Sequence, residues 1–319
     1  MRRFLISALA GFALGSSAVA AEQVKVALTQ IVAHPALDAV RKGVEDALAQ
    51  AGYRQGENLK YTYLSAQGNI STATQIARQF AGNQPDVIVA IATPSAQTML
   101  SATQDIPIVF SAVSDPVEAG LVKSLDRPGG NVTGVSDRSP VAGHLKLLRE
   151  IKPDIRKLGY LYNAAEANSV STLKLLQTLA AEQGIEIVPS AAARSSEVQM
   201  ATRALIGKVD MIYVPTDNTI IAVLEGASNA AAESQTPLFT ADPSSIGRGP
   251  FAAQGISYYD AGVETGRLAV RILNGEKPAD IAVVTPPARD VFIDLRAAKA
   301  MGVDIPQSVL DRATRIIKE

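Results

Sequence analysis

The sequence has 319 residues, among which there is no cysteine, no tryptophan and only two histidines. Without cysteine the chain can form no disulfide and offers no thiolate nucleophile. Its length allows a core large enough to fold without disulfides. His34 and His144 are too few for a histidine metal cluster, and no Walker or dinucleotide-binding glycine pattern follows a predicted strand. We therefore expect a protein that is not an enzyme and that binds neither a metal nor a cofactor.

Aromatic residues are also scarce, at 5% of the chain, and charged residues make up 19%. So few aromatic side chains argue against a sugar site built on stacked aromatic rings. The net charge is −1 and becomes −3 without Arg2 and Arg3, so the surface lacks the basic character that nucleic acids require. We expect a monomer with no nucleic-acid partner.

Residues 1–20 have the pattern of a secretory signal peptide. Arg2-Arg3 precede an apolar stretch from Phe4 to about Leu14, and Ala18-Val19-Ala20 form a small-residue cleavage site. The apolar stretch is shorter than the roughly 20 residues that span a bilayer, which disfavours an uncleaved membrane anchor. Cleavage after Ala20 is predicted to release the chain into the periplasm, without a lipid anchor because no cysteine is available.

Apolar strand-like runs alternate with segments of helical periodicity along the whole chain. Such alternation predicts parallel sheets built from right-handed βαβ units. We expect an α/β protein of two doubly wound parallel-sheet lobes joined by a hinge of three crossings. The first lobe is predicted to comprise residues 21–136 and about 257–285, and the second residues 137–256 and about 286–319.

The pattern beyond residue 217 predicts particular elements. Residues 218–234 are predicted to form one helix and residues 289–293 a strand beyond the third crossing. The segment 259–274 has apolar residues around almost its whole circumference, which predicts a buried helix that packs on the first lobe. A hinge of three crossings allows two lobes to close around a ligand.

Clusters of Ser, Thr, Asn and Asp follow six predicted strands, three in each lobe. In open α/β sheets, ligands bind beyond the carboxyl ends of the strands, where helix N-termini offer free N–H groups. Hydroxyl and N–H groups suit a carboxylate, and aspartates suit an amine. The candidate ligand-binding residues are His34, Thr93, Ser95, Ala96, Ser111, Val113 and Ser114 in the first lobe and Asn163, Asn168, Ser169, Asp217 and Asp242 in the second.

Ordinary helix and turn chemistry also explains each of these residues when it is taken alone. Thr93, Ser95 and Asp217 are typical N-cap residues. Asp242-Pro243 is a common start of a turn, and a histidine just before a helix, such as His34, is often a plain surface residue. Only the repetition of the clusters at strand ends in both lobes favours a ligand cleft.

Several short motifs, each weak alone, stand in a characteristic order. They are Gln30-Ile31-Val32, His34-Pro35-Ala36-Leu37-Asp38, Ala92-Thr93-Pro94, Ser114-Asp115-Pro116, Gly129-Gly130-Asn131-Val132-Thr133-Gly134, Tyr162-Asn163 with Asn168-Ser169, Thr216-Asp217-Asn218 and Asp294-Leu295-Arg296-Ala297-Ala298-Lys299. With these motifs the chain resembles the ABC-transporter substrate-binding proteins of the tryptophan/tyrosine type over essentially its whole mature length. The resemblance implies a type I periplasmic-binding fold whose closed form delivers a small-molecule ligand to an ABC permease in the inner membrane.

The resemblance also implies how a ligand is held. Aromatic amino acids are ligands in part of the family, so the small molecule is expected to be a zwitterion. Its carboxylate is expected at Thr93, Ser95 and the N–H of Ala96, and its ammonium at Asp242 or Asp217. One departure from the family is the missing lipid-attachment motif, which changes the anchoring and not the function.

Other ligands and roles are alternatives at this point. The ligand could be a nucleoside, a short peptide or an aromatic acid, and the protein could serve a periplasmic sensor. A hydrolase using Ser95 or Ser114 would lack a histidine partner for its nucleophile. Sequence does not define the side-chain pocket, for which His34, Tyr162 and Tyr258 are candidates.

Overall fold

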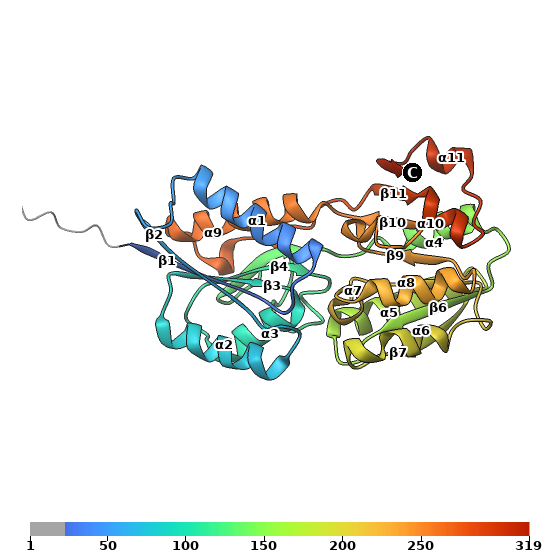
Figure 1. Ribbon diagram of the computed structural model, residues 1–319. Helices are drawn as coiled ribbons and strands as arrows, with labels where there is room; N and C mark the ends of the chain where they lie inside the picture. Colours follow the sequence, from blue (N-terminus) through green and yellow to red (C-terminus); the bar gives the residue numbers. More distant parts are fainter. Residues whose placement is uncertain (1–22, 319) are drawn as a thin grey trace, which may run out of the picture.

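The computed structural model describes residues 23–318, and the predicted signal peptide lies outside the described residues. The chain forms two lobes side by side, each with a sheet covered by helices (Figure 1). Each lobe has a hydrophobic core of its own, built from strand and helix residues of that lobe. The predicted fold class, a two-lobed α/β protein, is confirmed. No helix within residues 23–318 combines the length and apolar character of a membrane span.

The first-lobe sheet has five parallel strands in the order β2-β1-β3-β4-β5. Figure 1 shows helices α1 and α9 on one face of this sheet and α2 and α3 on the other. The central strand β3 is wholly buried because both of its faces are covered. The bounds are β1 (Val24–Gln30), α1 (Pro35–Gln50), β2 (Leu59–Ser65), α2 (Ile70–Asn83), β3 (Val87–Ile91), α3 (Thr93–Ala102), β4 (Ile108–Val113), β5 (Val132–Ser136) and α9 (Tyr258–Leu273).

The second-lobe sheet has seven strands in the order β12-β11-β10-β9-β8-β6-β7. Its strands are β6 (Lys157–Tyr162), β7 (Glu186–Ala191), β8 (Met211–Val214), β9 (Leu238–Thr240), β10 (Ala252–Gly255), β11 (Asp290–Asp294) and β12 (Arg315–Ile317). Its helices are α4 (Val141–Ile151), α5 (Ala167–Ala181), α6 (Val198–Arg203), α7 (Asn218–Ile221), α8 (Leu224–Glu233), α10 (Leu295–Ala300) and α11 (Gln307–Leu310). Short 3₁₀ turns occupy Ser195–Glu197, Pro243–Ser245 and Pro278–Asp280.

The second sheet departs from the prediction in that it is not wholly parallel. Strand β11 runs antiparallel to β10, and β12, which was not predicted, runs parallel to β11. The reason lies in the third crossing. The chain enters β11 from the first lobe, so β11, and with it the parallel β12, runs away from that lobe, whereas β6 to β10 run toward it.

Two predicted helices also differ from the structure. The expected single helix 218–234 is divided into α7 and α8, because Val223 between them has φ −131° and ψ 34°, outside the helical region. Helix α9 is amphipathic and not buried all round. Its exposed face carries charged side chains such as Arg267 and Arg271, whereas its buried face contains small residues.

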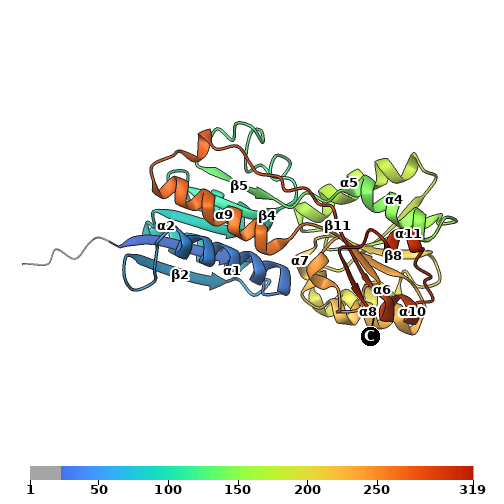
Figure 2. The ribbon, with the colours of Figure 1, turned by 90° about the horizontal axis from the view of Figure 1, so that it is seen from above.

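Helix α9 packs very closely against α1, as Figure 2 shows from above. A Cβ atom on Gly262 would lie 2.1 Å from the carbonyl oxygen of Val40, and one on Gly43 would lie 2.3 Å from the carbonyl oxygen of Tyr259. Only glycine permits this approach of two helix backbones. The contact fixes α9 on the first-lobe sheet although its sequence follows the second lobe's strand β10.

Three chain segments pass between the lobes. The first joins β5 to α4, the second joins β10 to α9, and the third leads from residues 281–284 to β11. Before it crosses, the third segment runs beside β5, where the N–H of Ser136 donates to Val284 O at 2.8 Å and the N–H of Val284 donates to Gly134 O at 2.9 Å. The first and third crossings are therefore tied together at the edge of the first lobe.

Candidate ligand-binding cleft

The cleft lies where the carboxyl ends of the strands of both lobes meet. A central cavity is lined by residues of the first lobe, of the second lobe and of the hinge: His34, Ala36, Leu37, Ala112, Asp137, Thr216, Asn218, Ile221, Asp242 and Tyr258. Its volume is about 10 Å³, which is close to the space of one water molecule. The lobes are thus nearly in contact at the centre of the cleft.

Thr93 and Ser95 lie at the start of α3, immediately after β3, and both are buried. Neither caps the helix: the N-cap residue is Ala92, and no side chain accepts a capping bond. Within the described part of the chain, neither hydroxyl has a hydrogen-bond partner. Buried polar groups normally have partners, so two unpartnered hydroxyls at one helix start are unusual. Neither side chain lines a described cavity, although Pro94 between them does.

Ala96 does not have the role expected of it. Its N–H donates to Ala92 O at 3.1 Å, inside the first turn of α3, and is therefore not free for a ligand carboxylate. The backbone before it is strained. Ala92 has φ 77°, and Ala112, at the end of β4, has φ 53°. Positive φ at alanine costs about 1–3 kcal/mol, and such strain concentrates at ligand sites.

The three candidates from the end of β4 separate in the structure. Ser111 Oγ accepts a bond from Thr265 Oγ1 of α9 at 2.8 Å, and Val113 is a fully buried core residue. Neither lines a described cavity of the cleft, because both serve packing in the first lobe. Ser114 does face the cleft. Its Oγ donates to Asp137 Oδ1 at 3.0 Å and lies 3.2 Å from Thr216 Oγ1 of the second lobe.

His34 lines the central cavity and is 8% exposed, so it is not the surface residue of the alternative interpretation. Among the residues that the structure describes, none hydrogen-bonds to either ring nitrogen. Burial, and to a smaller extent the charge of Arg248, lowers the pKa of His34, against the opposing effects of the Asp242 carboxylate and of the neighbouring Asn218 side chain. A neutral His34 can offer one donor and one acceptor to a ligand.

In the second lobe, Asp217 is fully buried, and its carboxylate accepts hydrogen bonds from residues of the same lobe. Oδ1 accepts the N–H of Ile220 at 2.9 Å, which caps α7, and Oδ2 accepts the N–H of Asn163 at 2.7 Å and Ser169 Oγ at 2.6 Å. Burial and the charge of Glu166 raise its pKa to about 7. Asp217 and Ser169 thus connect the loops that follow β6 and β8 and do not line a described cavity, since their polar atoms are already paired.

Asp242 both caps a turn and faces the cleft. Its Oδ1 accepts the N–H of Ser244 at 2.8 Å and its Oδ2 accepts Ser245 Oγ at 2.6 Å, while the side chain still lines the central cavity. The carboxylate is 2% exposed. A ligand amine at this point would contact the Asp242 carboxylate, whose position is fixed by hydrogen bonds from Ser244 and Ser245.

Asp137 was not predicted and is the second carboxylate of the central cavity. It lies in the first crossing, where Oδ1 accepts Ser114 Oγ and Oδ2 accepts Tyr258 OH at 3.0 Å. Burial raises its pKa to about 6, and the charge of Asp242 adds to the rise. A signal was available in the sequence, because an aspartate stands between Ser136 and Arg138 in the predicted first crossing, outside the polar clusters at strand ends that predicted the other candidates.

Glu166 was also missed. It is 6% exposed, and its carboxylate accepts bonds from Asn218 and Thr219 at the start of α7 and from Asn168. Asn163 joins the same network, since its Nδ2 donates to Thr219 Oγ1 at 2.9 Å. No pattern in the sequence indicates this role, because Glu166 precedes α5 as an ordinary acidic residue would.

A larger cavity of about 260 Å³ adjoins the central one and shares Asn218 with it. First-lobe residues give it an apolar wall that includes Ile31, Val32 and Pro94. Second-lobe residues give it a polar wall that includes Asn163, Glu166, Arg194 and Thr219. A flat or bulky apolar side chain would fit beside the first wall.

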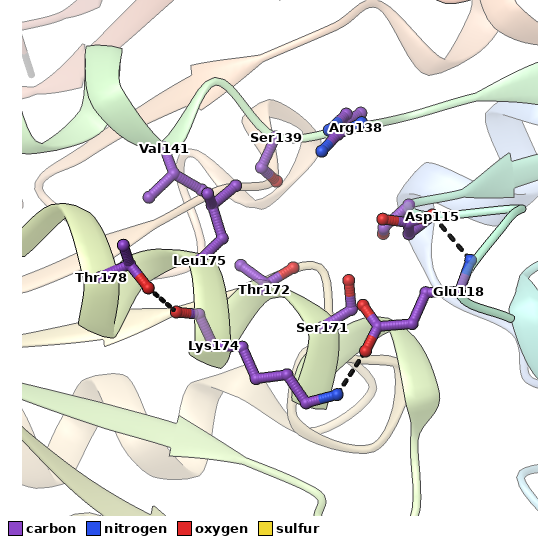
Figure 3. Close-up of a pocket in the computed structure, with 11 residues that line it drawn as sticks. Asp115, Glu118, Arg138, Ser139, Val141, Ser171, Thr172, Lys174, Leu175 and Thr178 are labelled. Carbon is purple, nitrogen blue, oxygen red and sulfur yellow. Dashed lines mark hydrogen bonds and ion pairs between the residues drawn. The ribbon is translucent and has the colours of Figure 1, made fainter.

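A third hollow, of about 220 Å³, is lined by residues of both lobes and includes Ser114. Figure 3 shows Asp115 and Glu118 on one side of it and Lys174 on the other. Lys174 of α5 forms an ion pair here with Glu118 of the first lobe, and Asp115 accepts the N–H of Glu118 at 2.9 Å. Together with the contact between Ser114 and Thr216, this ion pair joins the lobes across the cleft. Within residues 23–318, no three His, Asp or Glu side chains gather in a way that could hold a metal ion.

Comparison with known proteins assigns the chain to a family. The family described as "ABC transporter substrate binding protein" matches residues 25–317. The chain belongs to this family. It is 40% identical over 280 residues to the "Tyrosine-binding protein" of Clostridioides difficile (strain R20291), an alignment that covers 88% of this chain and 81% of that protein. The predicted membership among substrate-binding proteins of the tryptophan/tyrosine type is confirmed.

Two solved structures show the same fold. An ABC domain from Streptococcus pneumonia in complex with L-Trp is 34% identical, with a TM-score of 0.90 over 93% of this chain and 100% of that one. The ligand-free, open structure of a substrate-binding protein with adhesive properties from Clostridium difficile is 39% identical, with a TM-score of 0.70 over 93% and 100%. Proteins of this family bind ligands for transport by an ABC permease and are not enzymes.

Proposed function

We propose that this substrate-binding protein serves an ABC importer in the periplasm and holds a small zwitterionic amino acid, of the aromatic kind, between its lobes. The observation that carries the proposal is the pairing of groups in one closed cleft. Of the described residues that line the central cavity, two are buried carboxylates, Asp137 and Asp242, and none is a lysine or an arginine. At the start of α3, the buried hydroxyls of Thr93 and Ser95 have no partner within residues 23–318.

The carboxylates suit an ammonium group. The pKa of Asp137 is raised to about 6 because burial and the neighbouring Asp242 disfavour its charge. A bound ammonium would reverse that effect and would donate charge-assisted hydrogen bonds to the carboxylates, worth about 1.5–3 kcal/mol each. Asp217 is left out of this role, since its oxygens are already occupied by Ile220, Asn163 and Ser169.

Thr93 and Ser95 suit the ligand carboxylate, to which each can donate one hydrogen bond. Two or three such bonds together with the ammonium contacts, less the free energy lost on association, would give about −8 kcal/mol, the value of a micromolar site. A neutral sugar would leave the carboxylates of the central cavity without a counter-charge.

The cavity of about 260 Å³ is our proposed place for the ligand side chain. Its apolar wall of Ile31, Val32 and Pro94 would cover an aromatic ring. The ligands of the relatives support this choice, because one is named for tyrosine and another holds L-Trp. The better fit to the L-Trp complex than to the open structure supports a closed, ligand-competent arrangement of the lobes.

The test is a calorimetric titration of the mature chain, residues 21–319, with L-tyrosine, L-tryptophan, L-phenylalanine, a nucleoside, a dipeptide and glucose. We expect at least one aromatic amino acid to bind with micromolar affinity or better and the nucleoside and sugar not to bind. Binding of the nucleoside or the dipeptide alone would contradict the proposal and leave the family assignment intact.

A further inference from the structure

The second-lobe wall of the cleft contains a buried carboxylate, Glu166, which accepts several hydrogen bonds. Glu166 does not line the central cavity, but it lies in the polar wall of the adjoining cavity of about 260 Å³. Glu166 Oε2 accepts the backbone N–H of Asn218 at 3.0 Å and its side-chain Nδ2 at 2.6 Å. Oε1 accepts the N–H of Thr219 at 3.0 Å and its Oγ1 at 2.8 Å. Asn168 Nδ2 adds a fifth donor at 3.2 Å.

Five donors and no acceptor fit only the ionised form of Glu166, because a protonated carboxyl would have to donate into one of them. The ionised carboxylate in turn fixes the orientation of the amides around it. Asn218 must direct its Nδ2 toward Glu166, since its oxygen at 2.6 Å from a carboxylate oxygen would be repelled. The Oδ1 of Asn218 is therefore directed away from Glu166.

Asn218 lines the central cavity together with His34, Asp137 and Asp242. Because one N–H of its Nδ2 is bonded to Glu166, the Asn218 amide holds its Oδ1, a hydrogen-bond acceptor, on the side away from Glu166. Asn168 repeats the pattern. Its Nδ2 donates to Glu166 and to Thr216 O at 2.9 Å, and its buried Oδ1 has no partner within residues 23–318.

We infer that Glu166 is a positioning residue that makes this wall of the cleft select ligands carrying a hydrogen-bond donor, through the outward-facing amide oxygen of Asn218. The inference rests on the proposed function, because the donor is the ammonium of an amino acid or a donor group on its side chain. The amide oxygen of Asn218 can accept a hydrogen bond from either donor, because neither Glu166 nor Asn218 carries a positive charge that would repel an ammonium.

The experiment compares dissociation constants for L-tyrosine, desamino-tyrosine, which lacks the amine, and L-phenylalanine, which lacks the phenolic hydroxyl. Wild-type protein and the variants Glu166→Gln and Asn218→Ala are titrated under the same conditions. The amide introduced by Glu166→Gln would bring donors of its own to Asn218 and Thr219, which allows the Asn218 amide to turn. L-tryptophan and desamino-tryptophan replace the first pair if the wild-type protein binds only tryptophan.

We expect both variants to lose preference for the donor-bearing ligand by about ten-fold or more, the scale of one charge-assisted hydrogen bond. Loss against desamino-tyrosine identifies the amine as the donor, and loss against L-phenylalanine identifies the side chain. In the double variant, Glu166→Gln should add nothing to the effect of Asn218→Ala on this ratio, because Glu166 acts through Asn218.

A purely structural role would weaken all ligands equally and leave their ratio unchanged, which would overturn the inference. Asp294→Asn is the matched control. Asp294 is another buried carboxylate that accepts backbone N–H groups, from Arg296 and Ala297, and it does not line the cleft. If Glu166→Gln fails to fold, Asn218→Ala alone decides. Failure of wild-type protein to bind any amino acid would instead contradict the proposed function.

Discussion

The two walls of the cleft differ in how their polar groups are satisfied. In the first lobe, the hydroxyls of Thr93 and Ser95 at the start of α3 and both ring nitrogens of His34 in the central cavity are buried without partners among the described residues. On the second-lobe wall, the carboxylates of Glu166 and Asp217 organise the loops after β6 and β8 into one hydrogen-bonded network. The polar groups of the second-lobe wall already have partners, whereas for those of the first lobe we propose a ligand as the partner.

Because of this difference, substitutions in the two walls should affect different properties: the stability of the fold in one case and the affinity for a ligand in the other. Removing a group from the organised wall leaves donors without acceptors, which destabilises the fold. Removing a hydroxyl from the first-lobe wall removes a group that has no partner in the free protein, which costs the fold little. The following predictions use that contrast, beginning with the largest expected effect.

Asp217→Ala is expected to destabilise the protein most. The substitution would leave the N–H groups of Asn163 and Ile220 and the hydroxyl of Ser169 without their acceptor, at about 1–3 kcal/mol for each buried group. Urea unfolding should therefore show a loss of about 3 kcal/mol or more. An unchanged free energy of unfolding would mean that the wall is not organised by this carboxylate.

Asp137→Asn is expected to weaken binding of an aromatic amino acid by about ten- to hundred-fold, since it removes the charge that faces the ammonium. The thermal midpoint of the free protein should stay the same or rise, because ionised Asp137 is unfavourably buried. Calorimetry and thermal unfolding measure the two effects, with Asp294→Asn as the control. Equal affinity of Asp137→Asn and wild type would remove Asp137 from the site.

Binding should also depend on pH through Asp137. Its folded-state pKa is raised to about 6, so the free protein holds this proton more tightly than the unfolded chain and loses stability as pH rises through about 6. A ligand ammonium competes with that proton. Affinity should therefore increase from about pH 5 to about 6 and then level off.

Asp217, with a pKa of about 7, also titrates in this range. The contribution of Asp137 is therefore obtained by measuring the affinity of Asp137→Asn over the same pH values. The variant should lose most of the pH dependence. An identical profile in wild type and variant would assign the dependence to another group of the cleft.

The ion pair between Lys174 and Glu118 should have the smallest effect. Both side chains are more than one third exposed, and exposed pairs contribute about 0–1 kcal/mol. Glu118→Gln should raise the dissociation constant by at most about five-fold at low salt and less at high salt, since the pair joins lobes only in the closed form. The control is Glu233→Gln, whose partner Arg203 lies at 2.9 Å in the same lobe. A larger or salt-independent effect would contradict this expectation.

The sequence was sufficient to predict the fold class, because alternating strand and helix patterns determine a βαβ architecture. It did not reveal the direction of β11, which depends on the lobe from which the chain arrives. Nor did the sequence show that the Thr93 hydroxyl has no partner, whereas the N–H of Ala96 is already bonded to Ala92 O within α3. Such distinctions depend on partners that the three-dimensional fold supplies.

The site predictions show the same limit. Asp217 and Asp242 look alike in sequence, each an aspartate after a strand, yet only Asp242 lines the central cavity. Asp137 was missed although it stands in the predicted first crossing, and nothing in the sequence marks Glu166, because their partners Tyr258 and Asn218 lie 121 and 52 residues away along the chain. Long-range hydrogen bonds decide which acidic residues face a ligand.

The most direct test of the contrast between the walls is the double variant Thr93→Val with Ser95→Ala, studied by thermal unfolding of the free protein and by titration with L-tyrosine or L-tryptophan. Replacing unpartnered buried hydroxyls by apolar groups should leave the thermal midpoint unchanged or raise it, and should weaken binding by about ten-fold or more. A lower midpoint together with unchanged affinity would show that these hydroxyls support the fold and do not await the ligand.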